Sequence, residues 1–271
     1  MNKFWPCFFM FWPIVAVIAF AISPAMGWWF PSEAFSPLGR EIDNLFYLIL
    51  VIVGVVFVLT HVALGYALWR GVDNKATKGW FSHGSHNLEV LWSVAPAGIL
   101  MFISLYQLDV WRNFRVKSSF PNEVREGDAE VTARQFEWRI RYPAPGKKLS
   151  PIPQPDDLYT VNDLHVPVNR PFMIRLRSMD VQHSFFVPAL RIKQDAVPGQ
   201  VIPVWFEVTQ PGDYDLTCAE LCGWGHYKMR GRVLGQKRSD YEKYLVTLQA
   251  EQGFDGVSKP DSSGAEIVKT R

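Results

Sequence analysis

A long apolar run that contains no Asp, Glu, Lys or Arg most constrains how this chain can fold. It extends from Leu45 to Leu68 and consists mainly of aliphatic and aromatic residues. About 20 consecutive apolar residues in an α-helix span the hydrocarbon core of a bilayer. The run therefore predicts a membrane-spanning helix.

A second apolar segment, Leu88 to Leu108, carries one acidic residue, Glu89, near its start. The loop between the two segments contains Arg70, Lys75 and Lys78 and fewer acidic residues. Basic loops stay on the cytoplasmic side of a membrane. We therefore predict a helical hairpin whose two ends, and the domain that follows, face the outer side.

A third apolar segment, Phe4 to Ile22, lies near the start of the chain. It has two interpretations, a cleaved signal peptide with Lys3 as its basic end, or a retained helix. Pro13 within the segment and the aromatic cluster that begins at Trp28 favour a retained helix with interfacial rings.

The remainder of the chain has a different pattern, although 48% of the whole sequence is hydrophobic and its formal net charge is only +2. Apolar and polar residues alternate in 129–142, 172–177 and 201–208, as in half-buried strands. Pro-Gly turns and the lack of long helical periodicity predict a β-sandwich or barrel. Residues 143–155 form a proline-rich surface insertion, and the polar tail from 251 is expected to be disordered. The small net charge gives no indication of nucleic-acid binding.

Two thiols, an imidazole and a thioether lie within twelve residues, at Cys218, Cys222, His226 and Met229. Thiolate and thioether ligands select soft metals, and the methionine favours copper. A further imidazole is available at His183, in an apolar stretch that reads as a strand. A disulfide and a structural zinc site are the alternatives, but neither explains the methionine or the distant histidine.

The pattern Cys-x-Glu-x-Cys-x-x-x-His-x-x-Met, preceded by Asp-x-x-His, resembles the copper A motif of the cytochrome c oxidase subunit II family. The likeness extends over most of the chain, from about Ser36 to about Leu248. It implies two or three transmembrane helices followed by an all-β, cupredoxin-like Greek-key barrel. The expected division is an N-terminal hydrophobic segment, 1–30, a transmembrane hairpin, 31–121, the copper A domain, 122–250, and a tail, 251–271.

The resemblance also implies how the centre is built. Cys218 and Cys222 would bridge two copper ions as thiolates, and His183 and His226 would each bind one of them. Met229 and the backbone carbonyl of Glu220 would be weak outer ligands. The carboxylate of Glu220 would bind magnesium at the boundary with subunit I, since oxygen ligands suit a hard cation.

Four further residues acquire expected roles from the family. Glu89 would lie at the entrance of a proton channel, and Asp180 would belong to a surface that docks the electron donor. Phe136 stands where the family has a tryptophan that takes up electrons, and electrons would enter through Phe136 or Trp138. A structural aromatic core is the alternative for both rings.

The function implied is that of subunit II of an aa3-type cytochrome c oxidase, not catalytic by itself. It would accept electrons from a diffusing or complex-bound cytochrome and pass them to the haem-copper subunit that reduces oxygen. The expected location is a membrane, most simply the bacterial inner membrane, with the copper domain on the periplasmic side. The rivals are a metal-free scaffold subunit of a quinol oxidase, a nitrous-oxide reductase and a mononuclear blue-copper carrier.

Overall fold

The computed structural model of the chain describes residues 3–28, 33–73, 83–124 and 126–254. It divides into two compact units. The first comprises Met1–Ser32 and Glu41–Trp111, and the second Glu33–Arg40 and Arg112–Arg271.

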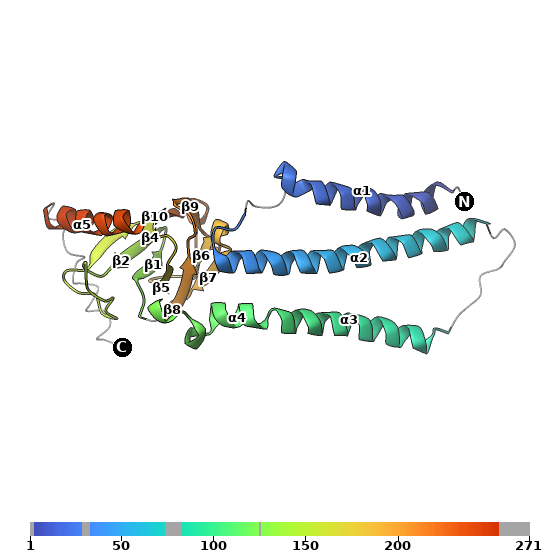
Figure 1. Cartoon of the computed structure of the whole chain (residues 1–271), viewed down its shortest axis with the longest axis horizontal. Helices are drawn as coiled ribbons and strands as arrows, with labels where there is room; N and C mark the ends of the chain where they lie inside the picture. Colours follow the sequence, from blue (N-terminus) through green and yellow to red (C-terminus); the bar gives the residue numbers. More distant parts are fainter. Residues whose placement is uncertain (1–2, 29–32, 74–82, 125, 255–271) are drawn as a thin grey trace. The chain divides into compact units, whose positions relative to one another are not determined.

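The first unit is helical and contains α1 (Phe4–Met26), most of α2 (Pro37–Asp73) and α3 (His86–Tyr106), with the start of the short α4 (Leu108–Arg115) (Figure 1). Each of the three long helices contains a stretch long and apolar enough to cross a membrane. The predicted hairpin is therefore confirmed as a pair of helices, and the first segment forms a third. Lys75 and Lys78 of the predicted cytoplasmic loop lie outside the described residues.

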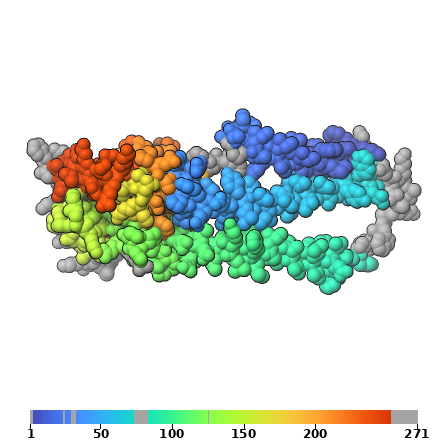
Figure 2. Space-filling view, in the orientation of Figure 1, coloured from blue at the N-terminus to red at the C-terminus, as the bar shows by residue number. Residues whose placement is uncertain are grey.

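A glycine marks where α1 and α2 pack together. A Cβ atom built on Gly65 of α2 would lie 3.0 Å from the carbonyl oxygen of Pro6 and would overlap the side chain of Met10. A larger residue at this position would push the helices apart, so Gly65 permits the contact between α1 and α2 that is visible in Figure 2.

The second unit is built on two five-stranded sheets. One has the order β3-β2-β1-β5-β8 and the other β4-β10-β9-β6-β7. The strands are β1 (Ala129–Arg134), β2 (Glu137–Tyr142), β3 (Leu158–Val161), β4 (Asp163–Pro167), β5 (Pro171–Ser178), β6 (His183–Val187), β7 (Ile192–Ala196), β8 (Ile202–Glu207), β9 (Gly212–Cys218) and β10 (Arg230–Gln236). Buried side chains of both sheets, among them Trp138, Phe185 and Phe206, form one core. This β-sandwich agrees with the predicted cupredoxin-like fold.

The predicted strands 172–177 and 201–208 are confirmed as β5 and β8. The predicted strand 129–142 is instead two strands, because the chain turns at Gln135 and Phe136 and pairs Arg134 with Glu137. The alternation of polar and apolar residues continues across this turn, which contains neither Gly nor Pro. Periodicity alone therefore could not reveal it.

Helix α5 (Arg238–Phe254) was not predicted. It lies on the outside of the sandwich, as Figures 1 and 2 show in red. Tyr241 and Tyr244 pack edge-on against Tyr142, and the ring of Tyr244 stacks on His165 at a centroid distance of 3.5 Å. The helix continues past the predicted start of the tail at 251, and residues 255–271 lie outside the described part of the chain.

A buried arginine anchors the proline-rich insertion between β2 and β3. Arg141 is 3% exposed and lies 2.6 Å from a carboxylate oxygen of Asp157 and 3.1 Å from one of Glu130. It also donates a hydrogen bond of 3.1 Å to the carbonyl of Ser150. The guanidinium is thus fully paired, as a buried cation must be to be tolerated.

Candidate metal centre

Strand pairing brings together two ligands that are 35 residues apart in sequence. His183 is the first residue of β6 and Cys218 is the last residue of β9. The two strands are antiparallel neighbours with Phe185 opposite Cys218, so the two side chains meet at the same end of the sheet. The loop that follows β9 then supplies the remaining predicted ligands.

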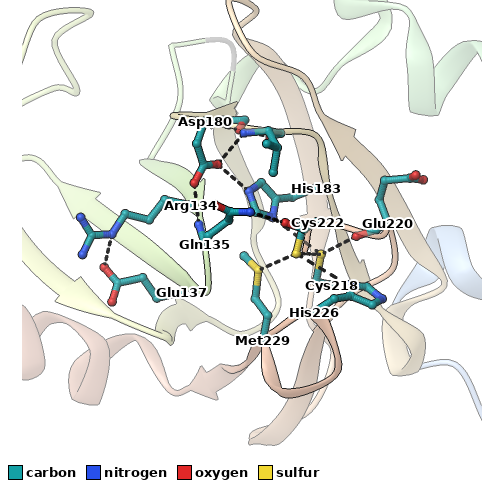
Figure 3. A network of polar contacts seen from close by, with 12 residues as sticks. Arg134, Gln135, Glu137, Asp180, His183, Cys218, Glu220, Cys222, His226 and Met229 are labelled. Carbon is teal, nitrogen blue, oxygen red and sulfur yellow. Dashed lines mark hydrogen bonds and ion pairs between the residues drawn. The ribbon is translucent and has the colours of Figure 1, made fainter. Parts of the chain in front are cut away.

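Three of the predicted ligands, His183, Cys218 and Cys222, form one buried cluster. Their ligand atoms all lie within 4.8 Å of one another. The two Sγ atoms are 3.9 Å apart, and Nδ1 of His183 lies 3.8 Å from Sγ of Cys218 (Figure 3). The spacing leaves room for metal ions between the donor atoms and is far too long for a disulfide, so both thiols are free.

The other two side chains of the motif contact the second cysteine. Nδ1 of His226 lies 3.7 Å, and Sδ of Met229 3.8 Å, from Sγ of Cys222. His226 opens the short 3₁₀ helix η4 (His226–Lys228), which turns the chain back so that the buried Met229 faces the cluster. The backbone amide of Cys218 donates to the carbonyl of Met229 at 3.1 Å, and this bond closes the loop.

The protonation of the two thiols differs. Burial opposes ionisation of Cys218, but hydrogen bonds from His183 and from the backbone outweigh it and lower its pKa to about 6. Burial, reinforced by the charge of Cys218, raises the pKa of Cys222 to about 12. The cluster holds one thiolate readily, and a second requires a cation. Soft sulfur and imidazole donors that need a compensating positive charge fit copper, and they fit zinc less well because of the thioether.

Asp180 orients the first histidine. Its Oδ1 lies 2.8 Å from Nε2 of His183, which leaves Nδ1 to face the sulfur. Burial acts to raise the pKa of Asp180, but the backbone hydrogen bond from Gln135 and the hydrogen bond with His183 outweigh it and lower the pKa. A carboxylate on the outer nitrogen of a metal-binding histidine fixes the ring and its tautomer. The predicted docking role of Asp180 stays a prediction.

Gln135 joins the two halves of the site and was missed in the sequence. Its backbone amide donates to Oδ2 of Asp180 at 2.7 Å, and its side-chain Nε2 donates to the carbonyl of Cys222 at 2.6 Å (Figure 3). The turn between β1 and β2 is thereby fixed to both ligand-bearing segments. No local pattern marks this residue, because its role depends on contacts with positions 45 and 87 residues away.

Glu220 presents its two oxygen-bearing groups in different directions. Its backbone carbonyl lies 3.2 Å from Sγ of Cys218. Its carboxylate points away from the sulfur atoms, as Figure 3 shows. The residue is therefore placed so that the carbonyl faces the cluster and the carboxylate is free to bind elsewhere.

The aromatic residues near the site differ sharply in exposure. Trp138 is completely buried, with its ring 6.4 Å from that of His183, so a donor cannot contact it directly. Phe136 is half-buried beneath the metal loop, where its ring lies 5.1 Å from that of Trp224. Trp224 is 76% exposed and was not singled out from the sequence.

Glu89 belongs to the first unit and lies in the first turn of α3. It is exposed, and no residue of α3 is buried within the described part of the chain. This position at the start of α3 agrees with the position of Glu89 predicted from the sequence, near the start of the second apolar segment. Its predicted role in proton uptake is not tested by these contacts.

Comparison with known proteins decides the family. The family model of the periplasmic domain of cytochrome c oxidase subunit II matches residues 144–234, and the model of its transmembrane domain matches residues 24–110. One match falls in each half of the chain, and together they take up well over half of it. The chain belongs to the cytochrome c oxidase subunit II family. The predicted class, a subunit of an oxidoreductase complex, is confirmed.

Individual proteins of known name are similar to this chain. The alternative cytochrome c oxidase subunit 2 of Bradyrhizobium diazoefficiens is 29% identical over 248 residues, which cover 84% of this chain and 87% of that protein. Cytochrome c oxidase subunit 2 of Cereibacter sphaeroides is 29% identical over 248 residues, or 80% of this chain and 78% of the relative. The solved periplasmic domain of subunit II from Bradyrhizobium japonicum matches with a TM-score of 0.40 and 23% identity, over 45% of this chain and 93% of that one.

The family and the structure together define the main parts of this subunit II chain. It is a membrane protein with apolar helices, followed by a domain of the periplasmic subunit II type that carries a His/Cys/Cys cluster suited to copper.

Proposed function

We propose that this chain is the electron-accepting subunit of an aa3-type cytochrome c oxidase and that the cluster holds a binuclear copper A centre. The observation that carries the proposal is the arrangement of two thiols 3.9 Å apart, with one imidazole beside each of them. When bound, the two copper ions would supply a site that gains and loses one electron with little rearrangement of its ligands.

The protein's own residues have defined tasks in this proposal. Cys218 and Cys222 would bridge the metals as thiolates, and His183 and His226 would each terminate one. Met229 and the carbonyl of Glu220 would complete the shell as weak ligands. Asp180 and Gln135 hold these groups in place through the hydrogen bonds described above, so that the donor atoms are already close together before metal binds.

The remaining assignments follow from the same proposal. The donor would be a cytochrome c or a complex-bound cytochrome, and electrons would pass on to a haem-copper subunit I. The carboxylate of Glu220 would bind magnesium at that boundary, and Glu89 would stand at a proton-channel entrance. The chain would lie in a bacterial inner membrane with residues 122–250 as the copper A domain on the periplasmic side.

A metal-free scaffold of a quinol oxidase is the rival function. Such a subunit has no reason to keep two buried free thiols, two imidazoles and a buried thioether within contact of one another. The donor set therefore favours the copper-bearing role, and the second cysteine disfavours a mononuclear blue-copper site.

The test is made on the assembled oxidase purified from its membrane. Cys222→Ser is compared with Cys7→Ser, which changes the third cysteine, on α1, outside the cluster. Oxygen consumption driven by reduced cytochrome c is expected to be lost in Cys222→Ser and retained in Cys7→Ser. Normal turnover in Cys222→Ser would contradict the proposed function.

A further inference from the structure

The metal loop turns its ligands inward and its largest apolar side chains outward. Leu221, Trp224 and Tyr227 are 77%, 76% and 75% exposed. No other large apolar side chain of the described residues is as exposed, even on the helices of the first unit. Single exposed apolar residues are ordinary, but three within seven residues mark a surface made for contact. We call these three residues the loop patch.

Trp224 is the middle residue of the loop patch in sequence. It is two residues from Cys222 and two from His226. Its ring packs edge-on against Phe136 at 5.1 Å, and the Nζ atom of Lys228 lies 4.4 Å from its ring centroid. Trp224 therefore packs against Phe136 and is the more exposed ring of this pair.

The packing beneath Trp224 requires a glycine. A Cβ atom on Gly225 would lie only 2.6 to 2.8 Å from atoms of the Phe136 ring. Because Gly225 has no side chain, the loop can lie directly on Phe136 and hold Trp224 outward above it. The exposed position of Trp224 is thus built into the loop.

The charge of the loop decides which partner fits. From Ala219 to Lys228 it carries one carboxylate, that of Glu220, and one ammonium group, that of Lys228. Asp180, which lies beside His183, adds one negative charge, and its side chain is 31% exposed. A donor with a strongly basic face would find little attraction here, whereas an apolar face would bury the rings.

We infer that the loop patch docks the apolar, exposed haem edge of a cytochrome and that electrons are taken up through Trp224 rather than at Phe136. The inference rests on the proposed function. One electron leaves the ferrous haem of the donor, which becomes ferric, and reduces the oxidised metal centre. No bond is made or broken and no proton is transferred. Trp is one of the residue types enriched among the residues that contribute most to binding in protein interfaces.

Docking is tested first on the full-length, metal-free chain in detergent, by biosensor binding of two soluble ferric c-type cytochromes. One probe has a net charge near zero, and the other is strongly basic. We expect the near-neutral probe to bind with an affinity that high salt barely changes, and Trp224→Ala to weaken it at least about tenfold. Ile152→Ala, which removes an exposed apolar side chain from the proline-rich insertion, is the control and should bind as the wild type does.

Three outcomes of the binding experiment would contradict docking at the loop patch. Equal binding by Trp224→Ala and the wild type would overturn the inference. So would the binding of neither probe, or binding by the basic probe alone that disappears at high salt.

Electron uptake is tested by rapid mixing of the assembled oxidase with the reduced near-neutral cytochrome. Trp224→Ala should slow reduction of the metal centre at least about tenfold, Trp224→Phe should restore part of the rate, and Phe136→Leu should cost less than Trp224→Ala. Dithionite, a small reductant that needs no docking surface, should reduce all variants equally. A normal copper spectrum with an unchanged rate in Trp224→Ala would overturn only this inference, whereas the absence of a copper spectrum in the wild type would overturn the proposed function.

Discussion

The carboxylate of Asp180 lies 2.8 Å from Nε2 of His183, while the other nitrogen of the same ring faces Sγ of Cys218. The ring is therefore held between a carboxylate and a thiol that belong to different segments. This relationship makes Asp180 a positioning residue for the metal centre, three residues from the ligand it orients.

Removal of this carboxylate should weaken metal binding without removing a ligand. Asp180→Ala frees the His183 ring and also takes an acceptor from the backbone of Gln135. We expect copper affinity to fall about 10- to 100-fold, as is usual when the partner of a ligating histidine is lost. The measurement is a competition titration with a copper chelator, and Asp156→Ala, at an exposed Lys147 contact, is the control. Equal affinities for both variants would exclude the role.

Met229 should tune the centre rather than hold it. Its side chain is buried and its Sδ lies 3.8 Å from Sγ of Cys222. Met229→Leu nearly conserves volume, so the core should remain intact. We expect copper to remain bound with a shifted reduction potential, measured by redox titration against the exposed Met179→Leu as control. Loss of copper, or an unchanged potential, would refute the assignment of a weak outer ligand.

Arg141 should matter for stability far more than its neighbour on the same strand. Arg141→Met removes the buried cation that pairs with Asp157 and Glu130, and leaves Glu130 only a 3.9 Å contact with Arg177. Breaking such a pair costs about 3–5 kcal/mol. Arg139→Met breaks a partly exposed pair with Glu137 and should cost at most about 1 kcal/mol. Urea unfolding of the full chain in detergent measures both, and equal losses would show that burial is not the deciding factor.

His165 should make the docking of α5 sensitive to acid. Burial lowers its pKa, despite its hydrogen bond with Gln236. The folded state therefore binds a proton at His165 less readily than the unfolded state does. The neutral ring stabilises the fold at pH values above the ordinary histidine pKa of 6.5, and this stabilisation is lost as the pH falls below that value. Through His165, the Tm of the metal-free chain should fall between about pH 7.5 and about pH 5.5, against the opposite contribution of His183, whose pKa is raised by its hydrogen bonds with Cys218 and Asp180 in spite of burial. His165→Phe keeps a ring against Tyr244 and should reduce this difference; an unchanged difference would contradict the assignment.

The sequence predicts the ligands of the centre well because their chemistry is unusual and four of them share one short loop. His183 could be added because it stands in a strand-like segment. The residues that hold the ligands in place could not be predicted in this way. Gln135 and Trp224 are ordinary in composition, and their roles arise only when the β1–β2 turn packs on the metal loop.

Two errors in the fold have different causes. The turn at Gln135 and Phe136 preserves the alternation of the flanking strands, so the sequence carries no sign of it. Helix α5, in contrast, was signalled by Tyr241, Tyr244, Leu245 and Leu248, which have the spacing of one helical face and pack on the core. The expected copper A domain includes residues 238–250, but as part of an all-β fold without this helix.

The central claim, a binuclear copper centre bridged by two thiolates, is tested most directly by metal analysis combined with EPR of the purified full-length chain. The account predicts two copper ions per chain and a mixed-valence signal in which one unpaired electron is shared by both. Cys218→Ser and Cys222→Ser should each abolish that signal. A single copper ion, zinc in place of copper, or an unchanged signal in either variant would contradict the claim.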